Sequence, residues 1–251
     1  MAGAGAGGAG AGSGGSAGVD PDLVIWYKFD EASGTGVSDA AMFGGTSRSG
    51  TIATVSTGTA TFSSMARVGS HALSLNGTSS TAGAYVSMPS LDTIAPNAIT
   101  IACWFYMTAD QSWQRVFDIG KGATPPLSYM FVTTHNAASS AAGLKFAITT
   151  MGNTMEQAIR MTTPTVPSVN AWHHVAVTLA AGSPYTGTLY IDRVVAGTNT
   201  AMTIHPSDLG ATDQNYIGKS QFVDPYFSGM IDDFRVYRRA LTAAEIAALP
   251  P

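Results

Sequence analysis

Two stretches of the sequence, Ile99-Thr-Ile-Ala-Cys-Trp-Phe-Tyr-Met107 and Trp172-His-His-Val-Ala-Val-Thr-Leu179, decide which fold is expected. In the first stretch every odd position is apolar, while Trp104 and Tyr106 stand at even positions. Side chains of a strand alternate between the two faces of a sheet, so this stretch predicts a strand with one aliphatic and one aromatic face. The second stretch alternates in the same way, with His174 opposite the aliphatic face. Both stretches therefore predict strands, and the first is expected to lie in the middle of a sheet.

Short segments of this kind recur along the chain, separated by Gly, Pro, Asn, Asp and Ser. The segments expected to be strands are Leu23–Asp30, Ala72–Leu75, Tyr85–Met88, Ile99–Met107, Gln114–Ile119, Tyr129–Thr134, Leu144–Met151, Glu156–Met161, Trp172–Leu179, Gly187–Asp192, Asn215–Gly218 and Phe227–Arg239. About a dozen strands with turn residues between them indicate an antiparallel sandwich or barrel. Helical spacing is expected in Thr242–Leu249, where Thr242 and Glu245 form a capping box and Pro250 ends the helix.

The composition is that of a folded chain, with 45% hydrophobic and 11% charged residues among 251. The net charge is −4 and no long basic run is present, which argues against nucleic acid as a partner. Apolar runs stay well below the roughly 20 residues that span a bilayer, so no membrane span is expected. A single cysteine, Cys103, cannot close an internal disulfide or build a cysteine-rich zinc site.

The N-terminal segment differs from the rest, because residues 2–18 contain only Gly, Ala and Ser. Such side chains are too small to bury, and glycine loses the most backbone entropy on ordering. We therefore expect a flexible tether over residues 1–20 and one domain over residues 21–251. A silk-like assembly element is the alternative for the tether. No signal peptide follows Met1, so the chain is either not exported by that route or is a piece of a longer protein.

Five blocks, occurring in the right order, resemble a known family. They are Leu23-Val-Ile-Trp-Tyr-Lys-Phe-Asp-Glu31, His71-Ala-Leu-Ser-Leu-Asn-Gly77, Trp172–Leu179, Thr188-Leu-Tyr-Ile-Asp192 and Gly229-Met-Ile-Asp-Asp-Phe-Arg-Val-Tyr237. Over about residues 22–249 the chain resembles a laminin-G-like, concanavalin A-like jelly-roll domain. This resemblance implies an all-β antiparallel sandwich with one short C-terminal helix.

A subtype is suggested by further segments, among them Arg115–Gly122, Tyr129–Thr133 and Asn215–Phe227. These segments resemble the version of the domain that is appended to secreted bacterial polysaccharide-degrading enzymes. The resemblance implies a non-catalytic accessory module that binds carbohydrate. Similar jelly rolls occur in virion proteins of large DNA viruses, which keeps a structural role open.

Candidate sugar contacts are aromatic and planar polar side chains, because rings stack on the C–H faces of sugars while polar groups bond the hydroxyls. The residues expected to form a carbohydrate-binding site are Trp113, Arg115, Tyr129, Glu156, Gln157, Asp224 and Tyr226. Phe222, Phe227 and Gln221 are further candidates. Each of these aromatic residues has the alternative role of packing within the core or a loop.

Catalytic patterns are missing from the sequence. Retaining glycosidases need two carboxyl groups about 5–5.5 Å apart, yet Glu31, Glu156 and Glu245 fall in different segments. Asp232 and Asp233 are adjacent, and neighbours on a regular strand point to opposite faces. His173 and His174 are separated in the same way, which disfavours zinc. We therefore expect that the chain is not an enzyme.

Calcium is the one cofactor for which the sequence offers ligands. Family members often bind Ca²⁺ where the terminal strands meet, and this metal takes carboxylate and carbonyl oxygens. Antiparallel pairing of the first and last strands would bring Asp30 and Asp232 together, with Asp39 as a third candidate. The alternative is that Asp232 is a buried carboxylate that bonds backbone amides or an arginine.

Together these features predict a non-catalytic, lectin-like module that binds a glycan or polysaccharide. The tether would join it to a parent enzyme or surface protein, raising the effective concentration of a weak binder. Its place would be extracellular or on a particle surface. The alternative is a structural virion or appendage surface protein that uses the jelly roll for protein–protein assembly, in which case exposed apolar patches are expected.

Overall fold

The computed structural model describes residues 19–91, 97–122, 125, 127–136 and 142–251. The expected tether over residues 1–20 therefore lies outside the described residues, except for Val19 and Asp20. Asp20 already belongs to the folded part, because its carboxylate accepts a hydrogen bond of 2.7 Å from Arg239. No helix in the described part of the chain is long and apolar enough to cross a membrane.

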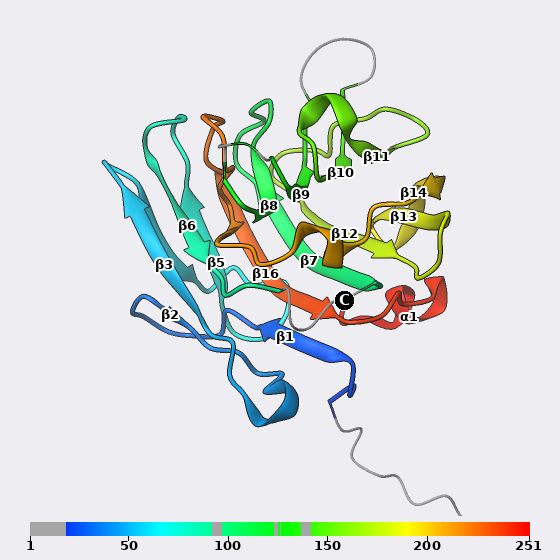
Figure 1. The fold of residues 1–251 in the computed structure, drawn as a ribbon. Coiled ribbons are helices and arrows are strands. Elements are labelled where there is room, and N and C mark those ends of the chain that lie inside the picture. The colour runs from blue at the N-terminus through cyan, green and yellow to red at the C-terminus, as the bar shows by residue number, and fades with distance from the viewer. Residues whose placement is uncertain (1–18, 92–96, 123–124, 126, 137–141) are drawn as a thin grey trace, which may run out of the picture.

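Two antiparallel sheets face each other across the core (Figure 1). Sheet A has the order β14 (Val194–Met202), β13 (Tyr185–Ile191), β12 (Trp172–Leu179), β7 (Ile99–Met107), β16 (Gly229–Tyr237), β5 (Ala72–Asn76) and β4 (Thr59–Ser63), with β1 (Leu23–Tyr27) also paired to β16. Sheet B has the order β11 (Gln157–Arg160), β10 (Lys145–Thr149), β9 (Tyr129–Thr133), β8 (Arg115–Gly120), β15 (Gln214–Ile217), β6 (Gly83–Ser87), β3 (Gly50–Val55) and β2 (Gly36–Val37). The expected all-β sandwich is confirmed.

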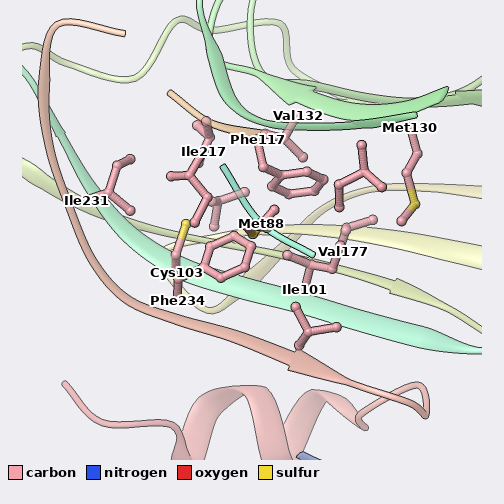
Figure 2. Close-up of a cluster of buried hydrophobic side chains, with 14 of the residues drawn as sticks. Met88, Ile101, Cys103, Phe117, Met130, Val132, Val177, Ile217, Ile231 and Phe234 are labelled. Carbon is pink, nitrogen blue, oxygen red and sulfur yellow. The ribbon is translucent and has the colours of Figure 1, made fainter. Parts of the chain in front are cut away.

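The core fills the space between the inner faces of the two sheets (Figure 2). The five odd-numbered residues of β7, from Ile99 to Met107, all belong to this core and are each at most 1% exposed. From the opposite sheet, Phe117 meets Phe234 of β16 edge to face, with ring centroids 6.2 Å apart. The alternation read from the β7 sequence is thus confirmed, and it fixes which of its side chains face outward.

The C-terminal helix α1 (Ala243–Ala248) packs on the outer face of sheet A. The predicted capping box is present: the amide of Glu245 donates to Oγ1 of Thr242 at 3.2 Å, and the amide of Thr242 donates to the Glu245 carboxylate at 2.7 Å. Ile246 is fully buried in a second apolar cluster with Leu23 and Tyr237. Helix α1 therefore covers only one end of the outer face of sheet A.

Four strands, β2, β3, β4 and β14, were not expected from the sequence. Strands β2, β4 and β14 lie at sheet edges, and β3 is followed only by the two-residue β2. Their side chains are largely small or polar and partly exposed, as in Thr59-Ala-Thr-Phe-Ser63. Such strands are held mainly by backbone hydrogen bonds to a neighbouring strand. Their sequences therefore show no alternating apolar pattern from which they could be predicted. Short 3-10 turns, η1 (Phe43–Gly45), η2 (Asn153–Met155) and η3 (Pro206–Leu209), lie in the loops.

The first and last strands lie side by side, as β1 and β16 in Figure 1. Trp26 pairs with Arg235 and Tyr27 with Phe234. A β-bulge interrupts β16 between Asp232 and Arg235, and Asp233 has a φ of 50° there. The regular alternation expected for two neighbouring aspartates therefore does not hold at this point.

Candidate functional site

A pocket with a volume of about 470 Å³ opens on the outer face of sheet B, over strands β8 to β11. Met130 and Val132 of β9 point into the core, so Tyr129 and Phe131 on the same strand point outward. The pocket is lined by Trp113, Arg115, Leu127, Tyr129, Phe131, Lys145, Asn153, Glu156, Arg160, Phe222 and Asp224. We call this set the aromatic pocket.

The wall of the aromatic pocket is built from rings in contact with one another. Tyr129 stacks on Phe131 with ring centroids 5.7 Å apart, and Phe222 meets Tyr129 edge-on at 5.5 Å. Trp113 is presented by the turn before β8, in a left-handed backbone conformation with a φ of 68°. Its amide donates to the carbonyl of His135 at 2.7 Å, which fixes the turn. Half-buried Trp113 thus faces a rigid aromatic surface.

Arg115 lies at the base of the pocket and has every part of its guanidinium engaged. It donates to the Trp113 carbonyl at 2.7 Å, to Asp224 at 3.0 Å and to Asp118 at 3.4 Å. Its Cζ atom also lies 4.0 Å from the ring centre of Phe131. Burial raises the pKa of the Asp118 carboxyl to about 6, although Arg115 pulls it down. The guanidinium is thus held in one orientation by carboxylates on two sides.

A second buried ion pair joins Lys145 of β10 to Glu156, whose other carboxylate oxygen accepts the Tyr129 hydroxyl at 2.8 Å. Burial lowers the pKa of Lys145, and Glu156 opposes that shift. Burial and then the charge of Glu156 hold the pKa of Tyr129 above its usual range, so the phenol stays a hydrogen-bond donor. Arg160 stands exposed at the rim with no ion-pair partner among the described side chains. The pocket thus offers fixed donors and acceptors beside its aromatic wall.

The structure brings together five of the seven residues expected to bind carbohydrate: Trp113, Arg115, Tyr129, Glu156 and Asp224. They come from four separate regions of the sequence, and all of them line the aromatic pocket.

Gln157 and Tyr226 lie outside the pocket. Gln157 directly follows Glu156, so strand alternation turns it away, and its amide side chain bonds Thr203 at 2.7 Å. Tyr226 is 7% exposed and packs with its ring centroid 6.1 Å from that of Tyr85. Its Cβ lies so close to Gly83 that any side chain at position 83 would collide with it. Tyr226 therefore has the packing role that was its alternative.

Sequence reasoning did not select five lining residues: Leu127, Phe131, Lys145, Asn153 and Arg160. For two of them a signal existed. In Leu144-Lys-Phe-Ala-Ile148, the apolar residues alternate with Lys145, which marks that lysine as outward-facing. Phe131 pairs with Ala147 across β9 and β10, so the two strands carry Phe131 and Lys145 on one face.

The aspartates expected to bind calcium fall into two groups. Asp39 accepts from the amides of Trp26, Ala41 and Arg48 at 2.9–3.0 Å and thereby organises the loop after β1. Asp30 instead bonds the amide of Ser70 at 2.5 Å.

Asp232 bonds the other end of the same segment, accepting from the amides of Arg67 and Val68 at 2.7 and 2.8 Å. Its second oxygen is buried without a hydrogen-bond partner, and burial raises the pKa of this carboxyl to about 6. In the described part of the chain no three His, Cys, Asp or Glu side chains gather at one point. Calcium binding therefore stays a prediction, resting on Asp30 and on the unmatched oxygen of Asp232.

A family model described as the concanavalin A-like lectin/glucanases superfamily, of the laminin-G type, matches residues 78–247. The chain belongs to this superfamily. No curated protein matches the chain. Among solved structures, it is similar to domain 4 of AbnA, a GH43 extracellular arabinanase from Geobacillus stearothermophilus, in complex with arabinotriose. The identity is 19%, the TM-score is 0.70, and the match covers 92% of this chain and 98% of that one.

Two further solved structures are similar in fold at lower TM-scores. The CBM40 of the Ruminococcus gnavus IT-sialidase, bound to alpha2,3 sialyllactose, matches at 18% identity with a TM-score of 0.52, over 62% of this chain and 83% of that one. The binding domain of botulinum neurotoxin serotype C1 matches at 12% identity with a TM-score of 0.60, over 92% of this chain. This chain spans about half of that toxin domain, 52% of its length. At these identities the likenesses show the fold.

Proposed function

We propose that the chain is a non-catalytic carbohydrate-binding module and that the aromatic pocket holds the glycan. The observation that carries this proposal is the pairing, in one pocket, of an aromatic wall with charged side chains held in fixed orientations. A sugar ring presents C–H groups on its faces and hydroxyls at its edge, so it needs both kinds of surface. Half-buried Trp113 and Phe222 are placed to stack on a sugar, and Glu156 and Asp224 to accept hydroxyl protons.

The similar structures support this proposal by what they hold. The arabinanase domain is solved with arabinotriose and the sialidase module with sialyllactose. Carried over to this chain, the common feature is an oligosaccharide on a concanavalin A-like sandwich. In our proposal the module acts outside the cell or on a particle surface, joined to another protein through residues 1–20.

A glycan array followed by calorimetry with the strongest ligand tests the proposal. Trp113→Ala should weaken binding by roughly tenfold, since a stacked ring contributes about 0.5–1.5 kcal/mol beyond its buried area. Trp172→Ala is the matched control, because Trp172 is also half-buried but lies on sheet A beside Tyr106. It should leave binding unchanged.

Three outcomes would contradict the proposed function. The first is the absence of any array signal together with concentration-dependent assembly in sedimentation, which would favour the structural alternative. The second is equal loss of binding in the two tryptophan variants. The third is release of reducing sugars from a polysaccharide substrate, which would make the chain an enzyme.

A further inference from the structure

A second cluster of chemistry-bearing side chains lies on the outer face of sheet A, around Trp104 of β7. Trp104 alternates with the core residues Cys103 and Phe105, so its ring points away from the core. Two guanidinium groups flank this ring: the Cζ atom of Arg67 lies 4.4 Å from its centre and that of Arg193 lies 5.2 Å away. We call these three residues the arginine–tryptophan cluster.

Neither arginine of the cluster forms an ion pair with a carboxylate in the described ranges. Arg67 is exposed and its backbone amide donates to Asp232, but its guanidinium forms no hydrogen bond with any residue that the structure describes. Arg193 donates from one terminal nitrogen to the carbonyl of Pro250, while its Nε is buried without a partner. The cluster therefore holds two positive charges whose donors are largely unused.

The neighbouring tryptophan provides an internal comparison. Trp26 of β1 is also flanked by two cations, with Lys28 at 4.3 Å and Arg235 at 4.4 Å from its ring centre. There, however, Asp233 forms an ion pair with Arg235 at 3.0 Å and accepts the indole N–H at 2.7 Å. The fold thus supplies an ion-pair partner beside Trp26. No carboxylate in the described residues forms an ion pair with the arginines at Trp104, although Asp233 acts on Arg193 from a longer distance.

The groups around the cluster respond to its positive charge. After burial, the charge of Arg67 is the next cause that lowers the pKa of Arg193, while Asp233 opposes the shift. His174, whose ring lies 5.2 Å from that of Trp104, has its pKa lowered to about 3 by burial and then by Arg193. Two guanidiniums that repel each other over one ring would be stabilised by an anion between them.

We propose that the arginine–tryptophan cluster is a second binding site, which takes an oxyanion such as the carboxylate or sulfate of an acidic polysaccharide. The planar fork of arginine matches the oxygens of such a group, and the ring of Trp104 keeps the two forks in place. This site is separate from the aromatic pocket, which lies on the opposite sheet, and it does not depend on the proposed function of that pocket.

The test follows the indole N–H signal of Trp104 by NMR, assigned with Trp104→Phe, while sodium sulfate is added. Sodium chloride at equal ionic strength is the reference titration, and the buffer contains no divalent cation. The signal should shift and saturate with sulfate alone. Arg67→Gln and Arg193→Gln should each weaken sulfate binding by roughly tenfold, since each removes charge-assisted hydrogen bonds.

Arg238→Gln is the matched control, because it removes the same charge from an arginine that is already paired with Asp22 at 2.8 Å. It should leave sulfate binding unchanged. Equal weakening in all three variants would mean a general charge effect and would overturn the proposal. So would a wild-type signal that responds alike to sulfate and chloride, or not at all.

The source of the anion is settled by competition. Polygalacturonate should displace sulfate from the wild-type protein and shift the same Trp104 signal, and it should fail to do so in Arg67→Gln. Displacement supports an acidic polysaccharide as the ligand. Saturation by sulfate without competition from polygalacturonate would overturn the polysaccharide part of the proposal and leave a site for free anions. Trp113→Ala should bind sulfate normally, which separates this test from that of the aromatic pocket.

Discussion

The aromatic pocket on sheet B and the arginine–tryptophan cluster on sheet A use similar residues in opposite ways. In the pocket, Arg115 and Lys145 are buried and each has a carboxylate partner. In the cluster, Arg67 and Arg193 lie closer to solvent and have no carboxylate partner in the described part of the chain. A cation that already has a carboxylate partner contributes mainly oriented hydrogen bonds to a ligand. A cation without such a partner attracts a ligand mainly by its charge. Under the two proposals, the paired cations of the pocket favour sugar hydroxyls, with Arg160 at the rim as an exception that is unpaired among the described side chains, and the cluster favours anions.

The largest expected effect concerns stability. Arg115→Ala should lower the free energy of unfolding by about 3–5 kcal/mol, because it leaves the buried Asp118 without its partner. Arg67→Ala should cost no more than about 1 kcal/mol, since an exposed arginine on a ring contributes little. Urea denaturation of both variants measures the difference. Equal losses of unfolding free energy in the two variants would contradict the distinction between paired and unpaired arginines.

The next largest expected effect is that of calcium on stability. It is expected at Asp232, because one carboxylate oxygen of this residue is buried without a hydrogen-bond partner in the described part of the chain. If Ca²⁺ fills that place, a concentration 100 times the Kd stabilises the fold by about 2.7 kcal/mol. The melting midpoint should then fall when a chelator is added, and Asp232→Asn should abolish this response. Identical midpoints with and without chelator would reject the metal.

Burial, followed by the charge of Arg193, lowers the pKa of His174 and predicts a pH effect on stability there. Its folded pKa of about 3 lies below the unfolded value of 6.5, so below pH 6.5 the unfolded chain binds the extra proton. Stability should be lost as the pH falls from 6.5 toward 3, by up to about 1.4 kcal/mol per pH unit. In His174→Leu this contribution disappears, which denaturation at several pH values will reveal.

The adjacent His173 is the control for that measurement. Its hydrogen bond to Asp192 raises its pKa, so its contribution is present below pH 6.5 and lost as the pH rises through the folded pKa. His173→Leu should therefore change the pH profile in the opposite direction from His174→Leu. The same sign in both variants would contradict the opposite pKa shifts of the two histidines.

The smallest expected effect is that of salt on the two binding sites. Screening shortens the reach of exposed charges, from about 10 Å at 0.1 M to 3 Å at 1 M ionic strength. Sulfate binding at the cluster should weaken as sodium chloride is added, while glycan binding in the pocket should change little. Calorimetry at two salt concentrations measures both. A pocket that is as sensitive to salt as the cluster would show that its ion pairs do not shield it.

The fold could be predicted from the sequence because buried apolar side chains carry the alternation in β7 and β12. Such side chains must face the core, which fixes the orientation of each strand. The pocket could be predicted in part, since Trp113, Tyr129 and Glu156 are aromatic or planar polar residues of the kind that bind sugars, and they lie at or just before the starts of strands. Gln157 shows why a list of residues is not enough: one step along β11 turns a side chain away from the pocket, and the sequence alone does not fix which neighbour faces it.

The arginine–tryptophan cluster was not accessible in this way. Arg67, Trp104 and Arg193 are far apart in the sequence, and each looks unremarkable by itself. They come together because two hydrogen bonds hold the segment after β4 to Asp232. A periodic sequence pattern does not predict such hydrogen bonds. Pairing of β1 with β16, by contrast, was implied by the resemblance to the jelly-roll family and is confirmed.

The two sheets pack against each other through their inner faces. The outward side chains of β7 and those of β9 therefore point to opposite sides of the molecule. A ligand seated on either layer is kept from the other by the full thickness of the packed interior. If both proposed sites bind polysaccharide, one copy of the molecule would hold two polymer strands at once and cross-link them.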